Sequence, residues 1–166
     1  MDLSGYDAII CVAGTRAYSD YNEFDSVLRD YISWLGPGKY VFISGDAWRG
    51  ADAMIIQWCT ENGYRCEKFP ADWDNDGKGA GFIRNRKMRD VCTHLLAFWD
   101  GESHGTEEMI EESMGTDRII VTIQFIENDG WKPKPFVKKQ GFNKNGWKSK
   151  GSRANGVRMP GRHSSW

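Results

Sequence analysis

The chain has 166 residues, of which 40% are hydrophobic and 27% charged, with a formal net charge of −1. These values are typical of a soluble globular protein, and the length suffices for one domain with a buried core. No stretch approaches the roughly 18 uninterrupted apolar residues of a transmembrane helix, which excludes a membrane-spanning class. The N-terminal segment has no basic region before its apolar run, so we predict a cytoplasmic protein without a signal peptide or a membrane partner.

The charge is unevenly distributed along the chain. Residues 1–126 contain 12 Lys/Arg and 21 Asp/Glu, a balance of −9, whereas residues 127–166 contain 10 and 2, a balance of +8. The second segment lacks apolar periodicity and cannot bury enough surface to offset its ordering entropy. We therefore predict a folded domain over 1–126 and a disordered, basic, aromatic-containing tail over 127–166.

Alternating apolar runs and amphipathic stretches predict strands and helices in turn. Strands are predicted over 6–13, 40–44, 65–69, 93–99 and 118–125, helices over 22–35, 51–62, 81–91 and 106–114, and a polar loop over 70–79. This alternation predicts a Rossmann-like α/β fold, with a parallel sheet of order 3-2-1-4-5 and helices on both faces. A ligand would lie at the carboxyl ends of strands one and four, where the winding direction reverses.

Two loops at predicted strand ends have residues that suit an anion. Gly14-Thr15-Arg16 combines a close turn, a hydroxyl and a cation, and the alternative is an ordinary turn with a solvent-facing arginine. The next such loop contains Ser44-Gly45-Asp46 and Arg49-Gly50-Ala51-Asp52. Its helix start could receive an anion, or Asp52 could simply favour the helix dipole. Trp48 would either stack on a base or cover the sheet edge.

Two predicted helix starts complete the candidate site. Arg84-Asn85-Arg86-Lys87 places three cations near a helix start, where the helix dipole disfavours positive charge. A bound anionic ligand would remove this conflict. The alternative is that these side chains form a solvated basic face of the helix. At the other start, Ser103 or Thr106 could cap the helix, and Gly105 leaves amides uncovered for a ligand.

The four cysteines, Cys11, Cys59, Cys66 and Cys92, show no metal-ligand spacing. We predict reduced thiols, no metal and no cofactor.

The motifs resemble those of the SLOG superfamily of Rossmann-like nucleotide-binding proteins, and most closely its small members, often encoded by phages or bacteria. The patterns of that branch are SGxxxGAD, ADWD, AGxxRNxxM and FWDGxSxGT. The matching residues here are Ser44-Gly45-Asp46 with Gly50-Ala51-Asp52, Ala71-Asp72-Trp73-Asp74, Ala80-Gly81 with Arg84-Asn85 and Met88, and Phe98-Trp99-Asp100-Gly101 with Ser103, Gly105 and Thr106. In the first match, four residues separate Gly45 from Gly50, one more than in the pattern. The resemblance covers about residues 6–123 and implies binding of a nucleotide or an NAD-derived ligand.

The same superfamily includes the Lonely Guy phosphoribohydrolases, which cleave the N-glycosidic bond of nucleoside monophosphates, and the DprA DNA-binding proteins. The hydrolase motifs match this chain at Arg84 and Met88 and at the Gly105-Thr106 pair. The position of their catalytic glutamate, however, is occupied by Met109. In an enzyme of this type Glu108 would have to replace that glutamate, beside Arg84. We therefore predict binding, in sensing or sequestration, with N-glycosidic hydrolysis as the alternative.

The residues predicted to bind the ligand are Gly14, Thr15, Arg16, Ser44, Gly45, Asp46, Trp48, Arg49, Asp52, Trp73, Arg84, Asn85, Asp100, Gly101, Ser103, Gly105 and Thr106. Arginines and helix amides would hold phosphate, and Asp100 or Asp46 a ribose hydroxyl. A base would stack on Trp48 or Trp73. The resemblance also implies a homodimer. The tail from Lys132 to Arg162 suits nucleic-acid contact, with a solubilising role or a strap across the acidic domain as alternatives.

Overall fold

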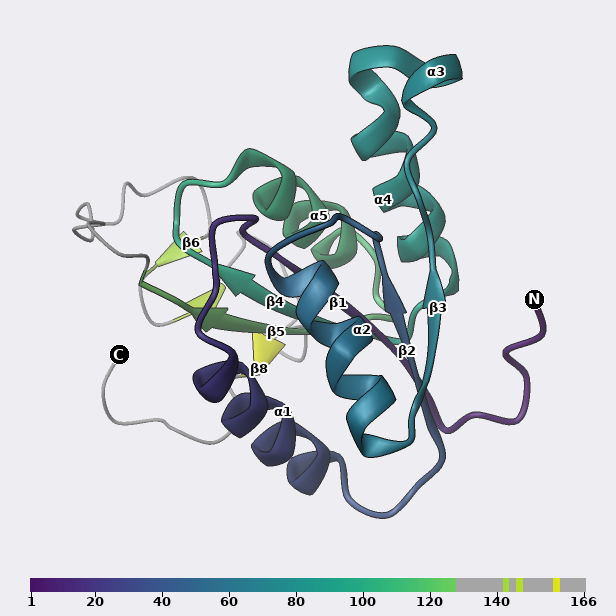
Figure 1. Cartoon of the computed structure of the whole chain (residues 1–166), viewed down its shortest axis with the longest axis vertical. Helices are drawn as coiled ribbons and strands as arrows, with labels where there is room; N and C mark the ends of the chain where they lie inside the picture. Colours follow the sequence, from purple (N-terminus) through teal and green to yellow (C-terminus); the bar gives the residue numbers. More distant parts are fainter. Residues whose placement is uncertain (128–141, 144–145, 148–156, 159–166) are drawn as a thin grey trace.

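The computed structural model describes residues 1–127 and the backbone of residues 142–143, 146–147 and 157–158. Its main sheet is parallel throughout, with strand order β3-β2-β1-β4-β5-β8 (Figure 1). The strands of this sheet are β1 (Ala8–Gly14), β2 (Tyr40–Ser44), β3 (Arg65–Lys68), β4 (His94–Trp99), β5 (Ile120–Phe125) and β8 (Val157–Arg158). The predicted order of the first five strands is confirmed, and the neighbours β1 and β4 form the switch point of the sheet.

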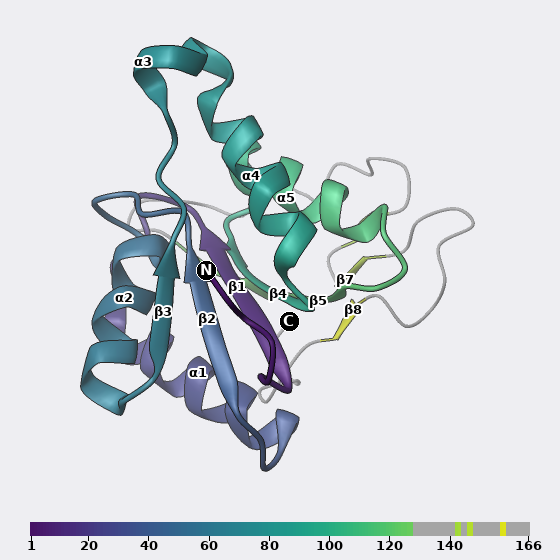
Figure 2. The same ribbon diagram turned by 90° about the vertical axis from the view of Figure 1, so that its right-hand side faces the viewer.

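Helices cover both faces of the sheet, as predicted. They are α1 (Tyr21–Leu35), α2 (Ala51–Asn62), α3 (Trp73–Asp76), α4 (Ala80–Val91) and α5 (His104–Met114), with a 3₁₀ turn, η1 (Gly77–Gly79). Helices α1 and α2 lie on one face and α4 and α5 on the other, whereas α3 projects beyond the carboxyl ends of the strands (Figure 2). Among the described residues, no helix is both long and apolar enough to span a membrane.

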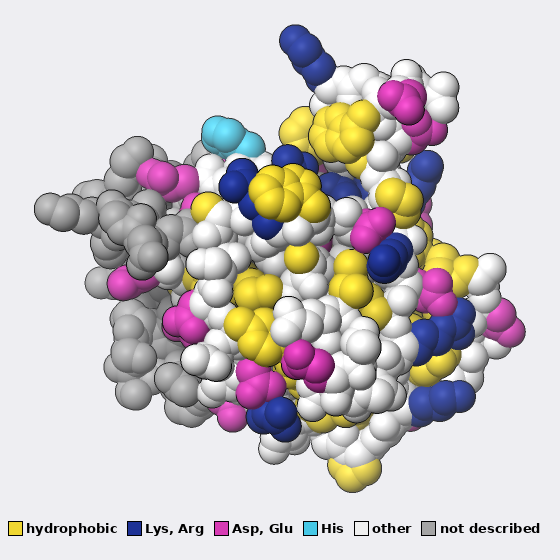
Figure 3. Space-filling model, in the orientation of Figure 1, with side chains coloured by type: hydrophobic (Ala, Val, Ile, Leu, Met, Phe, Trp, Pro, Cys, Tyr) yellow, Lys and Arg dark blue, Asp and Glu magenta, His cyan; other side chains and the backbone are white. Residues whose placement is uncertain are grey.

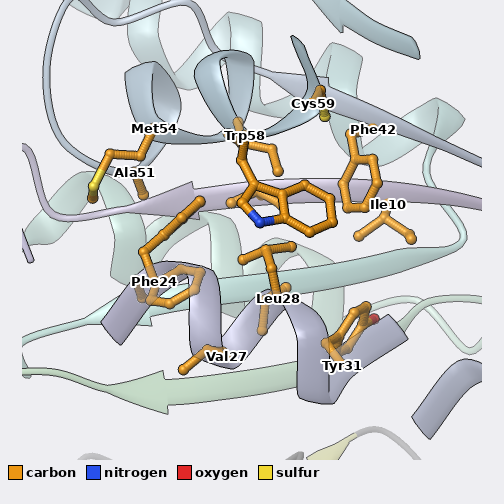
Figure 4. Packing of buried hydrophobic residues seen from close by; sticks show 14 of the residues in the cluster. Ile10, Phe24, Val27, Leu28, Tyr31, Phe42, Ala51, Met54, Trp58 and Cys59 are labelled. Atoms are coloured by element: carbon orange, nitrogen blue, oxygen red, sulfur yellow. The ribbon is translucent and has the colours of Figure 1, made fainter. Parts of the chain in front are cut away.

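The alternation of side chains along β1 explains how one strand serves two cores. Ile10 and Val12 belong to the cluster that packs under α1 and α2 (Figure 4), and Cys11 and Ala13 to the cluster under α4 and α5. Because successive side chains of a strand point to opposite faces, a strand buried on both sides must be apolar throughout. The short apolar runs of this sequence therefore specify central strands, and the amphipathic stripes of the helices close the two layers.

The segment after β3 departs from the prediction. Residues 70–79 are not a plain loop, because they contain the helical turn α3 and the 3₁₀ turn η1, which lead directly into α4. The carboxylate of Asp72 caps α3 by accepting a hydrogen bond from the Asn75 amide at 3.1 Å. Helix α4 then begins at Ala80, so Arg84 lies in its second turn and not at its start. The predicted conflict between these cations and the helix dipole is correspondingly weaker.

The predicted tail falls mostly outside the described residues. Within it the structure gives three two-residue strands, β6 (Phe142–Asn143), β7 (Gly146–Trp147) and β8. β6 pairs antiparallel with β7, and β8 pairs parallel with β5, adding a sixth strand to the predicted five. The proposed roles of the tail, and the division of the chain at residue 126, stay predictions.

Candidate functional site

A cavity of about 460 Å³ lies at the carboxyl ends of β1 and β4, between the loops that follow β1 and β2 and the first turns of α4 and α5. Eleven of the predicted ligand-binding residues line it. They are Gly14, Thr15, Arg16, Arg49, Asp52, Trp73, Arg84, Asn85, Ser103, Gly105 and Thr106. Segments distant in the sequence thus meet at the switch point, because the carboxyl ends of parallel strands share one edge of the sheet.

The floor of the cavity depends on a glycine at the end of β1. A Cβ at Gly14 would lie 2.7 Å from both the Phe98 carbonyl oxygen and the Ala51 Cβ, so a side chain there would collide with β4 and α2. The next residue, Thr15, donates its amide to the Phe98 carbonyl at 3.0 Å and is only 6% exposed. Its hydroxyl oxygen has no hydrogen-bond partner among the described residues. A buried hydroxyl without a partner is costly, and a ligand in the cavity would supply one.

A second glycine joins the loops after β1 and β2. Gly50 has a φ of +75°, and a Cβ there would lie 2.6 Å from the Thr15 carbonyl oxygen and 2.7 Å from the Arg16 Cα. Only glycine combines this backbone conformation with so close an approach. Gly50 also precedes α2 directly, so the same contact fixes where that helix begins relative to Thr15.

The opposite wall is held together by Asn85. Its side-chain amide donates to the Gly105 carbonyl at 3.3 Å and to the Glu108 carboxylate at 2.8 Å, which ties α4 to the first turn of α5. The carbonyl oxygen of the same side chain accepts from Arg84 Nε at 3.1 Å, and Arg84 Nη1 donates to the Gly45 carbonyl. Asn85 is buried, and its hydrogen bonds are therefore part of the frame of the cavity as well as its lining.

The N-terminus of α5 opens into the cavity without a side-chain cap. Ser103 is the N-cap residue, but its hydroxyl makes no capping hydrogen bond and lies 3.3 Å from the Thr106 hydroxyl. A Cβ at Gly105 would meet nothing within 4 Å. The amides of a first helical turn have no partner within the helix, and the helix dipole gives this end partial positive charge. This is a suitable place for an anion.

Most of the charged side chains in the cavity wall are cationic. Arg16, Arg49, Lys78 and Arg84 line it, against a single carboxylate, Asp52, among the described residues. Figure 3 shows Lys and Arg side chains beside large hydrophobic groups on the face between α3 and the start of α5. Burial raises the pKa of the Asp52 carboxyl above its usual value, and the positive charges of Arg84 and Arg16 oppose this rise.

Comparison with known proteins identifies the family. Residues 8–75, from β1 into α3, match the YAcAr family, described as the YspA, cpYpsA-related SLOG family. The chain belongs to the SLOG superfamily. It is also 33% identical over 113 residues to the Gene 61 protein of Mycobacterium phage D29, a match that covers 63% of this chain and 86% of the phage protein. No solved structure matches the chain.

Six residues of the SLOG-type motifs predicted to bind the ligand do not line the cavity. They are Ser44, Gly45, Asp46, Trp48, Asp100 and Gly101. Several of them hold the loops in place. The Ser44 hydroxyl donates to the Asp52 carbonyl at 2.9 Å, and Asp100 Oδ1 accepts from the amides of Glu102 and Ser103, both at 2.9 Å. Asp46 has a φ of +58° and pairs with Lys68 at 3.7 Å.

The cavity also includes residues that sequence reasoning missed. They are Ala13, Ala17, Lys78, Gly81, Phe82, Met88 and Met109. Lys78 was missed because η1 was not predicted, whereas Phe82 lies in a helix that was predicted, and only its contribution to the cavity was missed. Gly81 and Met88 belong to the AGxxRNxxM motif of the SLOG resemblance. Their place in that motif could have identified them as residues of the cavity.

The predicted catalytic position separates this chain from the SLOG hydrolases. Met109, where those enzymes have a glutamate, is fully buried and lines the cavity. Glu108 does not line it. One carboxylate oxygen of Glu108 accepts from Asn85, the other is buried without a partner among the described residues, and the residue borders a second cavity of about 300 Å³ with Arg89 and Glu112. Burial raises the pKa of Glu108.

Proposed function

We propose that the protein binds a nucleotide or an NAD-derived ligand at the carboxyl ends of β1 and β4. The observation that carries the proposal is the unpartnered hydroxyl of Thr15, buried in the wall of a cavity that also receives the uncapped N-terminus of α5. A phosphate oxygen would accept hydrogen bonds from the hydroxyl and from the amides of Gly105 and Thr106. Arg16 would contribute charge at the same loop.

The aromatic residues at the rim support a ligand with a planar base. Trp73 is 53% exposed and Phe82 is 42% exposed, and both line the cavity. These aromatic side chains bury only part of their surface in the fold, and stacking on a nucleobase would remove the rest from water. Trp48 is 81% exposed on the neighbouring loop, with the Arg49 guanidinium 4.9 Å from its ring centroid. It would contact only a part of the ligand that extends beyond the cavity.

Binding without hydrolysis is the better-supported function. A methionine stands at the position of the hydrolases' catalytic glutamate, and Glu108 forms part of the link between α4 and α5. Neither supplies a carboxylate to the cavity. A protein with this site would sense or sequester its ligand, and the phage relative is compatible with either role. The alternative, release of a base from a nucleoside monophosphate, would require Glu108 to reorient and break its hydrogen bond to Asn85.

Substituting Thr15 with valine tests the proposal. Thr15→Val keeps the shape of the side chain and removes the unpartnered hydroxyl, and Thr122→Val makes the same change in β5, away from the cavity. Isothermal titration with nucleoside 5′-monophosphates should show roughly tenfold weaker binding for Thr15→Val, the effect of one lost hydrogen bond to a charged group. Thr122→Val should bind like the wild type. Equal affinity of all three proteins, or no binding by the wild type, would refute the proposal.

A parallel incubation with the same nucleotides, analysed for free base, tests the alternative. We expect no base above that released in buffer. Base release by the wild type that disappears in Glu108→Ala would replace binding by hydrolysis as the function.

A further inference from the structure

Asp52 stands out because it is an acidic side chain in a cavity whose other charged side chains are cationic. Four Lys or Arg side chains and this one carboxylate line the cavity within the described residues. A carboxylate repels phosphate, so it weakens a site whose only task is to hold an anion. Its presence in the wall indicates a second kind of ligand group, one that donates hydrogen bonds.

Asp52 is held in a defined position. It is the second residue of α2, its carbonyl accepts from the Ser44 hydroxyl at 2.9 Å, and its Oδ2 accepts from the Ala47 amide at 3.2 Å. These two hydrogen bonds fix both the backbone and one carboxylate oxygen. The other oxygen, Oδ1, has no hydrogen-bond partner within residues 1–127 and remains an acceptor.

The nearby arginine does not use up this acceptor. Arg84 directs Nη1 to the Gly45 carbonyl and Nε to Asn85. A Cβ at Gly45 would lie 2.5 Å from Arg84 Nη1 and 2.7 Å from Asp52 Oδ2, so the missing side chain of this glycine is what lets both groups reach the cavity. Arg84 therefore stands beside Asp52 without forming an ion pair with it, and Oδ1 is left for a ligand.

We propose that Asp52 accepts hydrogen bonds from the ribose hydroxyls of the ligand and makes the site selective for ribonucleotides over 2′-deoxyribonucleotides. The inference rests on the proposed nucleotide binding and adds the sugar that the site recognises. An acidic side chain that binds ribose hydroxyls while the phosphate lies at a helix N-terminus is a general solution of Rossmann-like sites. The two acids favoured from the sequence, Asp46 and Asp100, lie outside the cavity lining, which leaves Asp52 for this role.

A purely structural role predicts a different outcome, and one variant separates the two. In Asp52→Asn the side-chain oxygen can still accept from Ala47, so the loop after β2 keeps its link, while the charge and one acceptor are lost. A structural role would lower the affinity for all ligands together. Selectivity for ribose would instead lower the affinity for the ribonucleotide alone. Asp30→Asn makes the same change in α1 and serves as the matched control.

The experiment is isothermal titration with adenosine and guanosine 5′-monophosphates, each paired with its 2′-deoxy form. The wild type and Asp30→Asn should bind the ribonucleotide at least about tenfold more tightly, and this ratio should fall to about one in Asp52→Asn. Equal affinity of the wild type for both members of a pair overturns the inference, whatever the fold of the variant. So does a ratio that survives in Asp52→Asn, or an equal loss for both sugars. If the wild type binds neither member of either pair, the proposed function is wrong, and the inference about Asp52 is wrong with it.

Discussion

The two sides of the cavity are built differently. The inner side, formed by the loops after β1 and β2, is fixed by Gly14 and Gly50, whose Cβ positions would collide with the backbone of Phe98 and of Thr15 and Arg16. The outer side, formed by α3 and η1, contains no buried residue. It projects beyond the sheet and carries exposed Trp73. The difference indicates that the fold preforms the inner side of the cavity. We expect the exposed side chains of the outer side to become packed only when a ligand binds against them.

The largest effect should come from adding a methyl group to the inner side. Gly50→Ala combines a positive φ with a collision against the backbone of Thr15 and Arg16, and we expect a loss of about 3 kcal/mol in unfolding free energy. Gly77→Ala in the outer side has a comparable backbone conformation, with a φ of 57° and a ψ of −137°, but meets nothing within 4 Å, so it should cost only the backbone strain, about 2 kcal/mol. Urea denaturation measures both. Equal losses would mean that the close approach at Gly50 does not contribute.

An intermediate effect, on binding more than on folding, should follow from removing the exposed indole of the outer side. Trp73→Ala should lower the unfolding free energy less than Gly50→Ala does, because the side chain is 53% exposed and α3 contains no buried residue. It should weaken nucleotide binding by roughly tenfold through lost stacking. Trp34→Ala, on the exposed side of α1, is the control for binding and should not change the affinity. Unchanged binding by Trp73→Ala would remove the outer side from the site.

The smallest effect concerns Glu108, at the junction of α4 and α5. Its pKa is raised in the folded protein, so the proton stabilises the fold below the usual glutamate pKa, and this contribution is lost as the pH rises through the raised value. Glu108→Gln keeps an acceptor for Asn85 and removes the buried charge. Its melting temperature should exceed that of the wild type by a few degrees at pH 7.5, with no difference near pH 4. Glu111→Gln, an exposed glutamate of the same helix, should show neither behaviour.

The strand order was predictable because it follows from a few physical regularities. Apolar runs such as residues 40–44 can only be central strands, and right-handed crossovers between them leave few arrangements. The loops that meet at the switch point could be placed for the same reason. Side-chain orientation could not be predicted in this way. Nothing in the sequence distinguishes Asp100, which binds amides of its own loop, from Asp52, which lines the cavity.

The outer side was missed because its signals are local and polar. Asp72 to Gly79 has the composition of a loop, yet the Asp72 carboxylate caps the Asn75 amide and the Asp76 amide donates to the Asp72 carbonyl, which makes a helical turn. That segment leads into α4 at Ala80 and contains Lys78, which lines the cavity. The position of such residues depends on a capping hydrogen bond. The sequence there has no hydrophobic periodicity from which that position could be predicted.

The central claim is that an anion binds in the cavity that Thr15 and the N-terminus of α5 both line, and amide chemical shifts test it most directly. In a ¹H–¹⁵N titration, adenosine 5′-monophosphate should shift the amide signals of Gly105, Thr106 and Thr15, and adenosine without phosphate should leave Gly105 and Thr106 nearly unmoved. Shifts at these two amides that are the same with and without phosphate, or shifts confined to the second cavity near Gly115 and Thr116, would contradict the claim.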